Sequence, residues 1–463
     1  MLKKFLATAS VAGLLAGAAS ALEVVPAVVG SPAGAPAILA AELDYAGGNV
    51  ATSGAHDQLR FTFYPTGAGA TFPTGNVVLR VVVTGAEFSS ALTGAEVGTA
   101  GTKVISSGGT AGSSAVNFLL SDVSGCTSGA PCTVDLPLEL TGSNVTVSAG
   151  LETDAGVPID NTSLTNLKTA SLAMLVPAFS ATITPSTTLS QATLASLFTS
   201  LTVDGILGSI TVAATQVDVD PGVPVVLETV KRDLLGNAVD ATDVDSIDVS
   251  VAGIMDSFDP ASTPAGAFDI GAGPTTVDAA ADTAEASIGL GVASTVTATP
   301  DGATAIERSD YVASIAVSVD ALSPLTTGAT FSGALQPITR EGTEITFPWT
   351  QTATQGEASG ATSVFRIGNL GASATGAVFG EVRNASEAGY TNPGIVQLAP
   401  SIDGNGEFVI NSADFEAAVG NYGRGDVRFI IEAQDSTLTG RQFVVRNGVI
   451  QQVIGGTVQQ DQN

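Results

Sequence analysis

Apolar and polar side chains alternate with a period of two along most of this chain, and Gly, Pro, Asn and Asp interrupt the alternation at short intervals. Because successive side chains of a β-strand point to opposite faces, this pattern predicts many short strands in antiparallel sandwiches. The clearest strands are predicted at residues 59–64, 76–84, 133–140, 313–319, 427–432 and 441–446. Asn447-Gly448 follows the last of these and predicts a two-residue hairpin turn.

Two short segments have helical periodicity instead. In residues 190–201, apolar side chains recur at Leu194, Leu197, Phe198 and Leu201, the spacing of one helix face. Residues 411–420 combine a capping Asn or Ser, acidic residues in the first turn and a terminal Gly. Both segments are predicted as short helices that connect strands.

The composition supports a β-rich protein and excludes several functions. The 463 residues include 44 acidic and 16 basic side chains, which gives a net charge of −28, and only 5% are aromatic. Nucleic-acid phosphates would repel so acidic a protein, so a nucleic-acid partner is excluded. A hydrophobic share of 44% also excludes a disordered acidic chain.

The first 21 residues have the pattern of a secretory signal peptide. Lys3 and Lys4 precede an apolar stretch at residues 5–18, and Ala19-Ser20-Ala21 fits a cleavage site. A membrane anchor is the alternative, but the stretch is shorter than the roughly 18 residues of a spanning helix. We expect a secreted, extracellular protein with no transmembrane segment in the mature chain, and removal of the two lysines would bring its net charge to −30.

Cys126 and Cys132 are the only cysteines, and they enclose a short Gly- and Pro-containing loop. In an exported chain such a pair predicts a structural disulfide that fixes a hairpin tip. A redox-active pair is the alternative, but the spacing is not Cys-x-x-Cys and no His or Lys is adjacent.

The length predicts several domains rather than one core. Segments rich in Pro, Ser and Thr at residues 182–185 and 322–328 mark the boundaries. We expect an all-β fold of several tandem immunoglobulin-like antiparallel β-sandwich domains with short connecting helices. The predicted division is a signal peptide (1–21), an N-terminal sandwich region (22–184), an acidic middle sandwich (185–327) and a C-terminal sandwich (328–463).

Three segments carry a resemblance to a known family. Residues 160–184, above all the run SLAMLVPAFSAT at 171–182, resemble a segment of Sec-exported, Ala/Thr/Val-rich surface-layer-type (S-layer-like) proteins of Gram-negative bacteria. Residues 363–371 and 425–433 are similar to the C-terminal sandwich of those proteins. The resemblance covers about half of the chain as a pattern, and it implies a structural role in the cell envelope and no active site.

Catalytic constellations are not found in the sequence. His56 is the only histidine and lies in a predicted turn, and there is no Gly-x-Ser-x-Gly motif. One His and two Cys also exclude the usual zinc sites. Two carboxylates could serve a glycosidase, but sugar sites are usually lined by aromatic residues, and Trp349 is the only tryptophan. We therefore expect a protein that is not an enzyme.

Clustered carboxylates are the stronger chemical signal. They suit Ca²⁺, which takes several oxygen ligands and would offset the repulsion between close acids. Asp243 and Asp245, if both lie in a strand, would point to one face. A solvated acidic loop is the alternative for each cluster. The predicted ligands in these clusters are Asp218, Asp220, Asp240, Asp243, Asp245 and Asp248.

A further calcium candidate contains Asp403, Asn405 and Glu407, whose spacing is similar to that of an EF-hand loop. Phe408 stands where the sharp turn of such a loop needs Gly. The favoured interpretation is a Gly-rich hairpin turn followed by a helix capped at Asn411 or Ser412.

The leading hypothesis is a non-catalytic structural protein of the cell surface. It would be a self-assembling subunit of an S-layer or related extracellular array, with calcium-bridged contacts between copies and outer-membrane glycan as a possible further partner. One alternative is a filament or pilus subunit joined by β-strand addition, with residues 22–40 as the donor strand. The others are a secreted adhesin or glycan-binding protein and a hydrolase that uses two carboxylates.

Overall fold

The computed structural model describes residues 22–27, 34–43, 58–66, 70–99, 101–141, 144–159, 162–220, 226–233, 236–357, 360–385, 390–433 and 437–460. The predicted signal peptide and His56 lie outside these residues. Within them strands make up most of the regular secondary structure, and the α-helices are α1 (Ala353–Glu357) and α2 (Ser412–Val419). No helix of the described residues is both long enough and apolar enough to cross a membrane. The predicted all-β sandwich class is confirmed.

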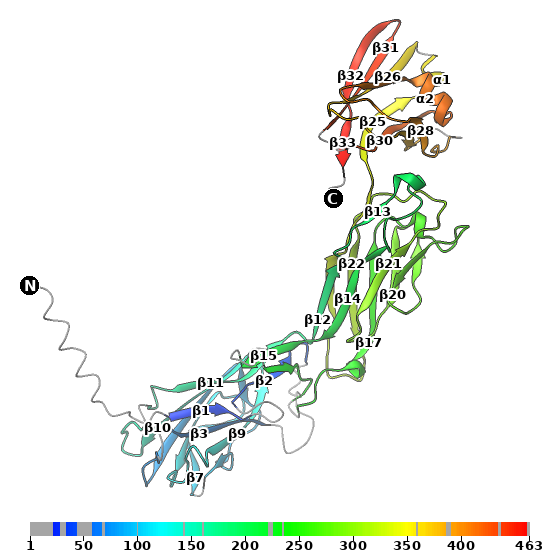
Figure 1. The fold of residues 1–463 in the computed structure, drawn as a ribbon. Helices are drawn as coiled ribbons and strands as arrows, with labels where there is room; N and C mark the ends of the chain where they lie inside the picture. The colour runs from blue at the N-terminus through cyan, green and yellow to red at the C-terminus, as the bar shows by residue number, and fades with distance from the viewer. Residues whose placement is uncertain are drawn as a thin grey trace, which may run out of the picture.

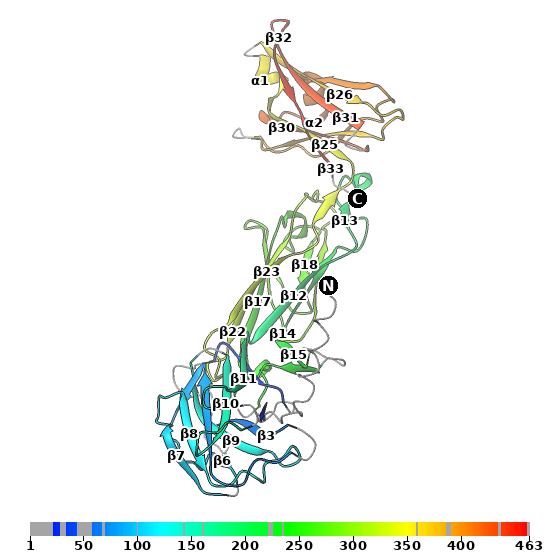
Figure 2. The same cartoon turned by 90° about the vertical axis from the view of Figure 1, so that its left-hand side faces the viewer.

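The strands form three units along an extended molecule (Figure 1). We name them the N-terminal unit (residues 22–176), the middle unit (179–340) and the C-terminal unit (343–460). A view turned by 90° shows the same order, with the N-terminal and C-terminal units at opposite ends (Figure 2).

Two sheets pack face to face in the N-terminal unit. One has the order β1-β3-β9-β5, with β6 beside β9, and its strands are β1 (Leu22–Pro26), β3 (Gln58–Pro65), β5 (Ala86–Phe88), β6 (Val97–Gly98) and β9 (Cys132–Leu140). The other has the order β2-β11-β10-β4-β8-β7, and its strands are β2 (Ala37–Ala40), β4 (Val77–Thr84), β7 (Lys103–Gly108), β8 (Ala115–Leu120), β10 (Val145–Thr153) and β11 (Lys168–Val176). In the longer strands, such as β4 and β8, alternate apolar side chains are buried in the space between the sheets.

The middle unit is a second sandwich with two small additional sheets. Its first sheet, β12-β14-β21-β18, contains β12 (Phe179–Pro185), β14 (Ile206–Ala214), β18 (Ala267–Ile270) and β21 (Ser294–Thr299). The facing sheet, β19-β20-β17-β22-β23, contains β17 (Val244–Ala252), β19 (Thr276–Asp278), β20 (Thr283–Ser287), β22 (Val312–Val319) and β23 (Ala329–Ala334). The small sheets pair β13 (Ser190–Ala192) with β24 (Ile338–Arg340) and β15 (Gln216–Asp220) with β16 (Val226–Thr229).

The C-terminal unit packs two sheets and helix α2 around an aromatic core. The sheet β28-β27-β30-β25-β33 contains β25 (Thr343–Gln351), β27 (Val378–Arg383), β28 (Val396–Ala399), β30 (Arg424–Ile431) and β33 (Thr457–Gln460). The sheet β29-β26-β31-β32 contains β26 (Ala361–Asn369), β29 (Glu407–Asn411), β31 (Leu438–Arg446) and β32 (Val449–Gly455). Phe365 lies at the centre of the core, with its ring centroid 5.3 Å from that of Phe429 and 5.9 Å from that of Phe415.

The strand pairing places the first change of sheet several residues before the predicted boundary at 184/185, and the second more than ten residues after the predicted boundary at 327/328. Residues 182–185, predicted as a connector, belong to β12, which pairs along its whole length with β14 of the middle unit. Residues 329–334, predicted to open the C-terminal domain, form β23 and pair with β22. The first change of sheet therefore precedes residue 179, and the second follows β24.

The predicted strands are all present, but one of the two predicted helices is wrong. Residues 411–420 contain α2, which Asn411 caps by accepting hydrogen bonds from the backbone N–H groups of Ala413 and Asp414. Residues 190–201 instead contain β13 and the single 3₁₀ turn η1 (Leu194–Ser196). β13 pairs parallel with β24, and Leu197 and Phe198 take left-handed backbone conformations, which a continuing right-handed helix does not contain.

The segment proposed as a donor strand is paired inside its own unit. β1 pairs antiparallel with β3 in one sheet, and β2 pairs parallel with β11 in the other. Leu22, Ile38, Leu39 and Ala40 are fully buried there. The segment therefore supplies an edge strand to each sheet of the N-terminal sandwich (Figure 1).

The N-terminal and middle units share one continuous apolar core. At the junction the main chain of Leu39 bridges to Lys231, and that of Leu43 bridges to Leu325. Glu42 lies between them, and its carboxylate accepts a hydrogen bond from the backbone N–H of Ala178 at 2.7 Å. These contacts fix the first junction.

Replacing Ile38 by Ala tests the burial of this segment. We expect the variant I38A to lose about 2–5 kcal/mol of unfolding free energy, since a fully buried side chain leaves a cavity. The matched control is L322A, because Leu322 is 95% exposed and its truncation should change stability by less than about 0.5 kcal/mol. Urea unfolding followed by circular dichroism measures both, and equal midpoints would contradict the observed packing.

Candidate functional site

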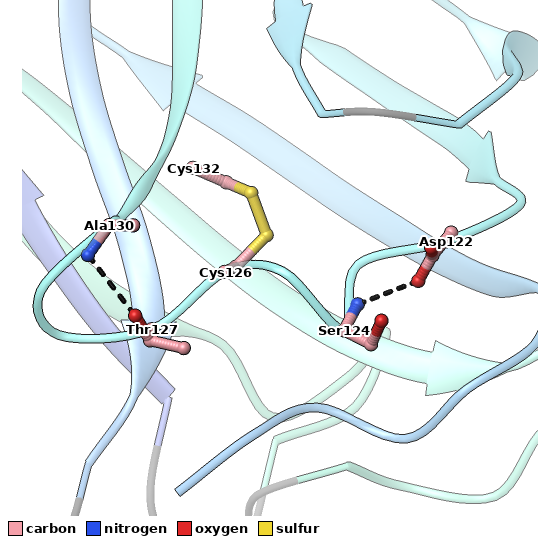
Figure 3. Close-up of a disulfide and its surroundings, with 6 residues drawn as sticks. All are labelled: Asp122, Ser124, Cys126, Thr127, Ala130 and Cys132. Atoms are coloured by element: carbon pink, nitrogen blue, oxygen red, sulfur yellow. Dashed lines mark hydrogen bonds between the residues drawn. A yellow bond between two sulfur atoms is a disulfide. The ribbon is translucent and has the colours of Figure 1, made fainter. Parts of the chain in front are cut away.

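The predicted disulfide is present between Cys126 and Cys132, whose Cα atoms are 5.1 Å apart (Figure 3). Thr127 and Ala130 exchange backbone hydrogen bonds inside the closed loop. Beside it the Ser124 backbone N–H donates to the Asp122 carboxylate, and hydrogen bonds from Ser124 lower the pKa of Asp122. The loop joins β8 to β9, which lie in different sheets, and inside the disulfide ring the antiparallel bridge between Thr127 and Ala130 forms a small hairpin tip, as predicted.

Asp240 and Asp243, predicted calcium ligands, form a helix cap. Asp243 is fully buried, and its carboxylate accepts hydrogen bonds from Arg232 at 3.1 Å, from the Ser323 hydroxyl at 2.8 Å and from the Asp240 backbone N–H at 2.9 Å. The Asp240 carboxylate accepts from Thr242, and this lowers the pKa of Asp240. Arg232 thus neutralises the Asp243 carboxylate, for which Ca²⁺ was the predicted counter-ion.

The prediction that Asp243 and Asp245 share one strand face is wrong. Asp243 ends the 3₁₀ turn η2 (Ala241–Asp243) and is buried, whereas Asp245 is exposed in β17. Asp248 is exposed further along β17, where its carboxylate accepts hydrogen bonds from the hydroxyls of Ser246 and Ser287. Asp218 lies in the separate hairpin β15–β16, as does Asp220, so these clusters are not brought together.

Residues 403–407 form a turn, as the favoured interpretation predicted. Asn369 donates from its side-chain amide to the carbonyl oxygens of Ile402 and Asp403, and Asn405 has a left-handed backbone. Glu407 begins β29 and forms an ion pair with Arg366 at 2.6 Å. The turn joins β28 to β29, which lie in different sheets, so the predicted hairpin is a crossover. Across the described part of the chain, no three His, Cys, Asp or Glu side chains come together as metal ligands.

A groove of about 840 Å³ lies on the outer face of the sheet β19-β20-β17-β22-β23. Its walls carry Asp248 and Glu285 among small hydroxyl side chains, namely Ser250, Thr276, Ser287, Ser314, Thr330 and Ser332. Cross-strand pairing places Ser250 between Glu285 and Ser314, and Asp248 beside Ser287. The groove therefore offers hydroxyl and carboxylate oxygens to anything that binds it.

The most densely charged site lies where the middle unit meets the C-terminal unit. The sheet containing β27 and β30 is buried on both faces. Val378 and Phe429 point into the C-terminal core, whereas their neighbours Phe379 and Ile430 belong to the core that runs through the other two units. Glu381 and Arg428 are paired across β27 and β30 on the same face as Phe379 and Ile430.

Arg340 occupies the centre of this junction with 0% of its surface exposed. Its Nη2 lies 2.6 Å from Oε1 of Glu307, and its Nε donates to the Ile306 carbonyl oxygen at 2.6 Å. The guanidinium also lies over the Phe198 ring, 4.5 Å from the centroid. The segment that was predicted as a helix therefore provides one wall of the Arg340 site, a favourable cation–π contact.

Three arginines and three glutamates form the site, and we call these six residues the ionic junction. Besides Glu307, Arg340 contacts Glu344 and Glu381, each at 3.5 Å. Arg383 pairs with Glu307 and Glu381, and Arg428 lies 3.5–3.7 Å from all three glutamates. The formal charges sum to zero, which is the condition under which buried ions are tolerated.

Burial shifts the ionisation of this cluster. It raises the pKa of Glu381, while the charges of Arg340 and Arg428 act in the opposite direction. Burial likewise lowers the pKa of Arg340 and, together with the charge of Arg428, lowers that of Arg383 to about 10.

The ionic junction was not among the sites predicted from the sequence. Its charged residues alternate with apolar ones in strands, a pattern that also describes a face exposed to water. The available signal was the break in alternation at Val378-Phe379 and Phe429-Ile430-Ile431, since consecutive apolar residues mark strands buried on both faces.

Comparisons with known proteins add little to this geometry. No protein-family model matches the chain, and no curated protein matches it in sequence. Among solved structures, a chain described as "Putative membrane anchored protein from Corynebacterium diphtheriae" is 10% identical and aligns over 94% of this chain and 88% of that one, with a TM-score of 0.23.

Replacing Arg340 by Met should uncouple the C-terminal unit. Removing one partner of a buried ion network costs about 3–5 kcal/mol, because the remaining carboxylates stay buried without their counter-charge. In calorimetry, R340M should unfold the C-terminal unit in a separate, earlier transition. The control R366M removes an exposed ion pair worth about 0–1 kcal/mol, and an R340M trace identical to that of R366M would contradict the role of the junction.

The loss of stability that R340M causes should become smaller as the pH falls. The pKa of Glu381 in the folded protein is raised above its ordinary value of 4.5. At a pH between these two pKa values, Glu381 binds more protons in the folded protein than in the unfolded chain. Acidification therefore stabilises the folded state through this residue. In R340M the pKa of Glu381 in the folded protein should rise further. We expect a smaller difference in Tm between wild type and R340M at mildly acidic pH than at neutral pH, and a larger one would refute this account.

Proposed function

We propose that this chain is a non-catalytic structural protein of the cell surface. Copies of it would assemble into an S-layer or a related extracellular array. Divalent cations, above all Ca²⁺, would lie between carboxylates that face one another across the contacts.

The observation that carries the proposal is an extended molecule in which both junctions are fixed by buried contacts. The shared core and Glu42 fix the first junction, and the ionic junction fixes the second. Domains joined by flexible linkers move independently unless their interface is substantial. A rigid extended subunit keeps a constant spacing between its ends, and a repeating array needs such a subunit.

The sequence features favour a location outside the cell and a role without catalysis. The signal-peptide pattern and the disulfide suit an oxidising compartment. Both cysteines are used in the disulfide, which leaves no thiol nucleophile. The resemblance to surface-layer-type proteins is consistent with the same function.

The excess of acidic residues is the reason why we propose cations between the copies. Two copies that each carry a charge near −30 repel one another unless counter-ions lie between them. Asp245, Asp248, Asp403 and Glu407 are exposed, so these predicted ligands are accessible to a second molecule. A cation would then take oxygen ligands from two copies at once.

Two alternatives rest on particular observations. A filament joined through residues 22–40 is disfavoured, because β1 and β2 already pair within their own unit. A glycan-binding adhesin is favoured by the groove, whose hydroxyl and carboxylate oxygens could accept and donate hydrogen bonds to sugars. Glycan-array binding that is lost in S250F but kept in L322A would support the adhesin.

Assembly of the purified mature protein tests the proposal. In millimolar CaCl₂ we expect light scattering to rise and electron microscopy to show periodic sheets, because bound cations neutralise the facing acids. EDTA should dissolve the sheets. A chain that stays monomeric under all conditions would refute the array, and sheets that withstand EDTA would refute only the calcium bridges.

A further inference from the structure

A cleft of about 400 Å³ lies on the outer face of the sheet β29-β26-β31-β32. Phe365 and Ile367 of β26 point into the core of the C-terminal unit, so Arg366 and Gly368 face outward and line the cleft. The sheet lies at the end of the molecule opposite the N-terminal unit (Figure 2). The cleft is therefore open to a ligand in solution.

The strand register explains why this part of the sheet is hollow. Gly368 of β26 pairs with Glu407 of β29 on one side and with Thr439 of β31 on the other. A Cβ atom added at Gly368 would lie 3.0 Å from the hydroxyl oxygen of Thr439. Because glycine has no side chain, it leaves a depression between a carboxylate and a hydroxyl.

Two arginines stand directly opposite each other beside this depression. Arg366 pairs with Arg441 across β26 and β31, and both residues line the cleft. Like charges at directly opposed positions of a sheet destabilise it. An anion that lies close to both guanidinium groups would remove this repulsion.

The carboxylate in the cleft neutralises one arginine and leaves the other. Arg366 forms an ion pair with Glu407 at 2.6 Å, whereas no carboxylate of the described residues forms an ion pair with Arg441. The charged residues that line the cleft are these two arginines and Glu407, so their formal charges sum to +1. In a chain with a net charge of −28, this cleft is a local site of positive charge.

The other walls are suited to a sugar ring rather than to a bare ion. Phe443 lines the cleft, and its ring centroid lies 6.0 Å from the guanidinium carbon of Arg366. Leu370, which is 63% exposed, adds apolar surface. Thr439 and Asn405 also line the cleft, and a hydroxyl and an amide can exchange hydrogen bonds with ligand hydroxyls. Apolar surface combined with a few polar groups is typical of small-molecule sites.

We propose that this cleft binds an acidic saccharide. The sugar carboxylate lies beside Arg441, the sugar hydroxyls contact Glu407 and Thr439, and the apolar face of the ring lies against Phe443. A guanidinium can hold a carboxylate through two parallel hydrogen bonds, so Arg441 selects an acidic sugar over a neutral one. The inference goes beyond the proposed array, because one copy contains the entire cleft.

Calorimetric titration of the mature protein tests the inference, at concentrations where light scattering shows single copies. Trigalacturonate should bind, and the neutral galactotriose should bind about tenfold more weakly or not at all, because it lacks the charged partner of Arg441. The variant R441Q should weaken the binding of trigalacturonate by about tenfold or more, because a hydrogen bond between charged groups is lost.

The matched control is R446Q. Arg446 is exposed on the same strand, and the alternation along β31 places it on the opposite face from Arg441. R446Q therefore removes the same charge without touching the cleft, and it should bind trigalacturonate as the wild type does. Thermal unfolding of each variant verifies that its fold is intact.

Filling the depression separates a shaped site from simple attraction between charges. G368V keeps both arginines, and its side chain would occupy the space between Glu407 and Thr439. It should lose the binding of trigalacturonate. If G368V unfolds early, T439F covers the same depression from an exposed position.

Several results would overturn the inference. Equal affinity of wild type and R441Q for trigalacturonate would refute the role of Arg441, and undiminished binding in a folded cleft-filling variant would refute the cleft. Inorganic phosphate that binds as tightly as trigalacturonate would show a simple anion site and refute the saccharide. Loss of binding in S250F but not in R441Q would place the sugar in the groove of the middle unit. None of these results decides the proposed array, which the assembly assay tests separately.

Discussion

The arrangement of the molecule depends on one buried charge, that of the Arg340 guanidinium. A cation without access to water is stable only if opposite charges and hydrogen-bond acceptors surround it. Glu307 comes from the middle unit, and Glu344 and Glu381 come from the C-terminal sheet, so the neutralising groups assemble only in one relative position of the two units. The requirement to neutralise Arg340 thus sets the direction in which the C-terminal unit continues.

Different interactions fix the first junction, between the N-terminal and middle units. Between the N-terminal and middle units the apolar core is continuous, and main-chain bridges from Leu39 and Leu43 cross the boundary. Non-directional apolar burial tolerates some rotation, whereas the hydrogen bonds of Glu42 give the boundary a definite geometry. Together the two junctions hold the three units in one extended arrangement.

The scarce basic residues have positions that the composition does not suggest. Three of them neutralise the ionic junction, Arg232 neutralises the buried Asp243, and Arg441 and Arg446 are exposed at separate positions of β31. Other basic side chains are exposed and scattered over the molecule, among them Lys168, Arg366 and Arg424. With acids outnumbering bases 44 to 16, copies of this protein repel one another wherever counter-ions do not screen their charge.

The local pattern of the sequence determined the strands, the Asn447-Gly448 turn, helix α2 and the disulfide, because each depends on neighbouring residues and on steric and hydrogen-bonding rules of short range. It also indicated the turn at 403–407 from the position of Phe408. Only the tertiary structure decided that residues 190–201 form a strand and a loop under Arg340, that Asp243 binds an arginine and that one face of the C-terminal sheet is buried against the middle unit. Alternation of apolar and polar residues shows that the two faces of a strand differ. It does not show whether water or another unit covers the polar face, because contacts between residues far apart in the chain decide this.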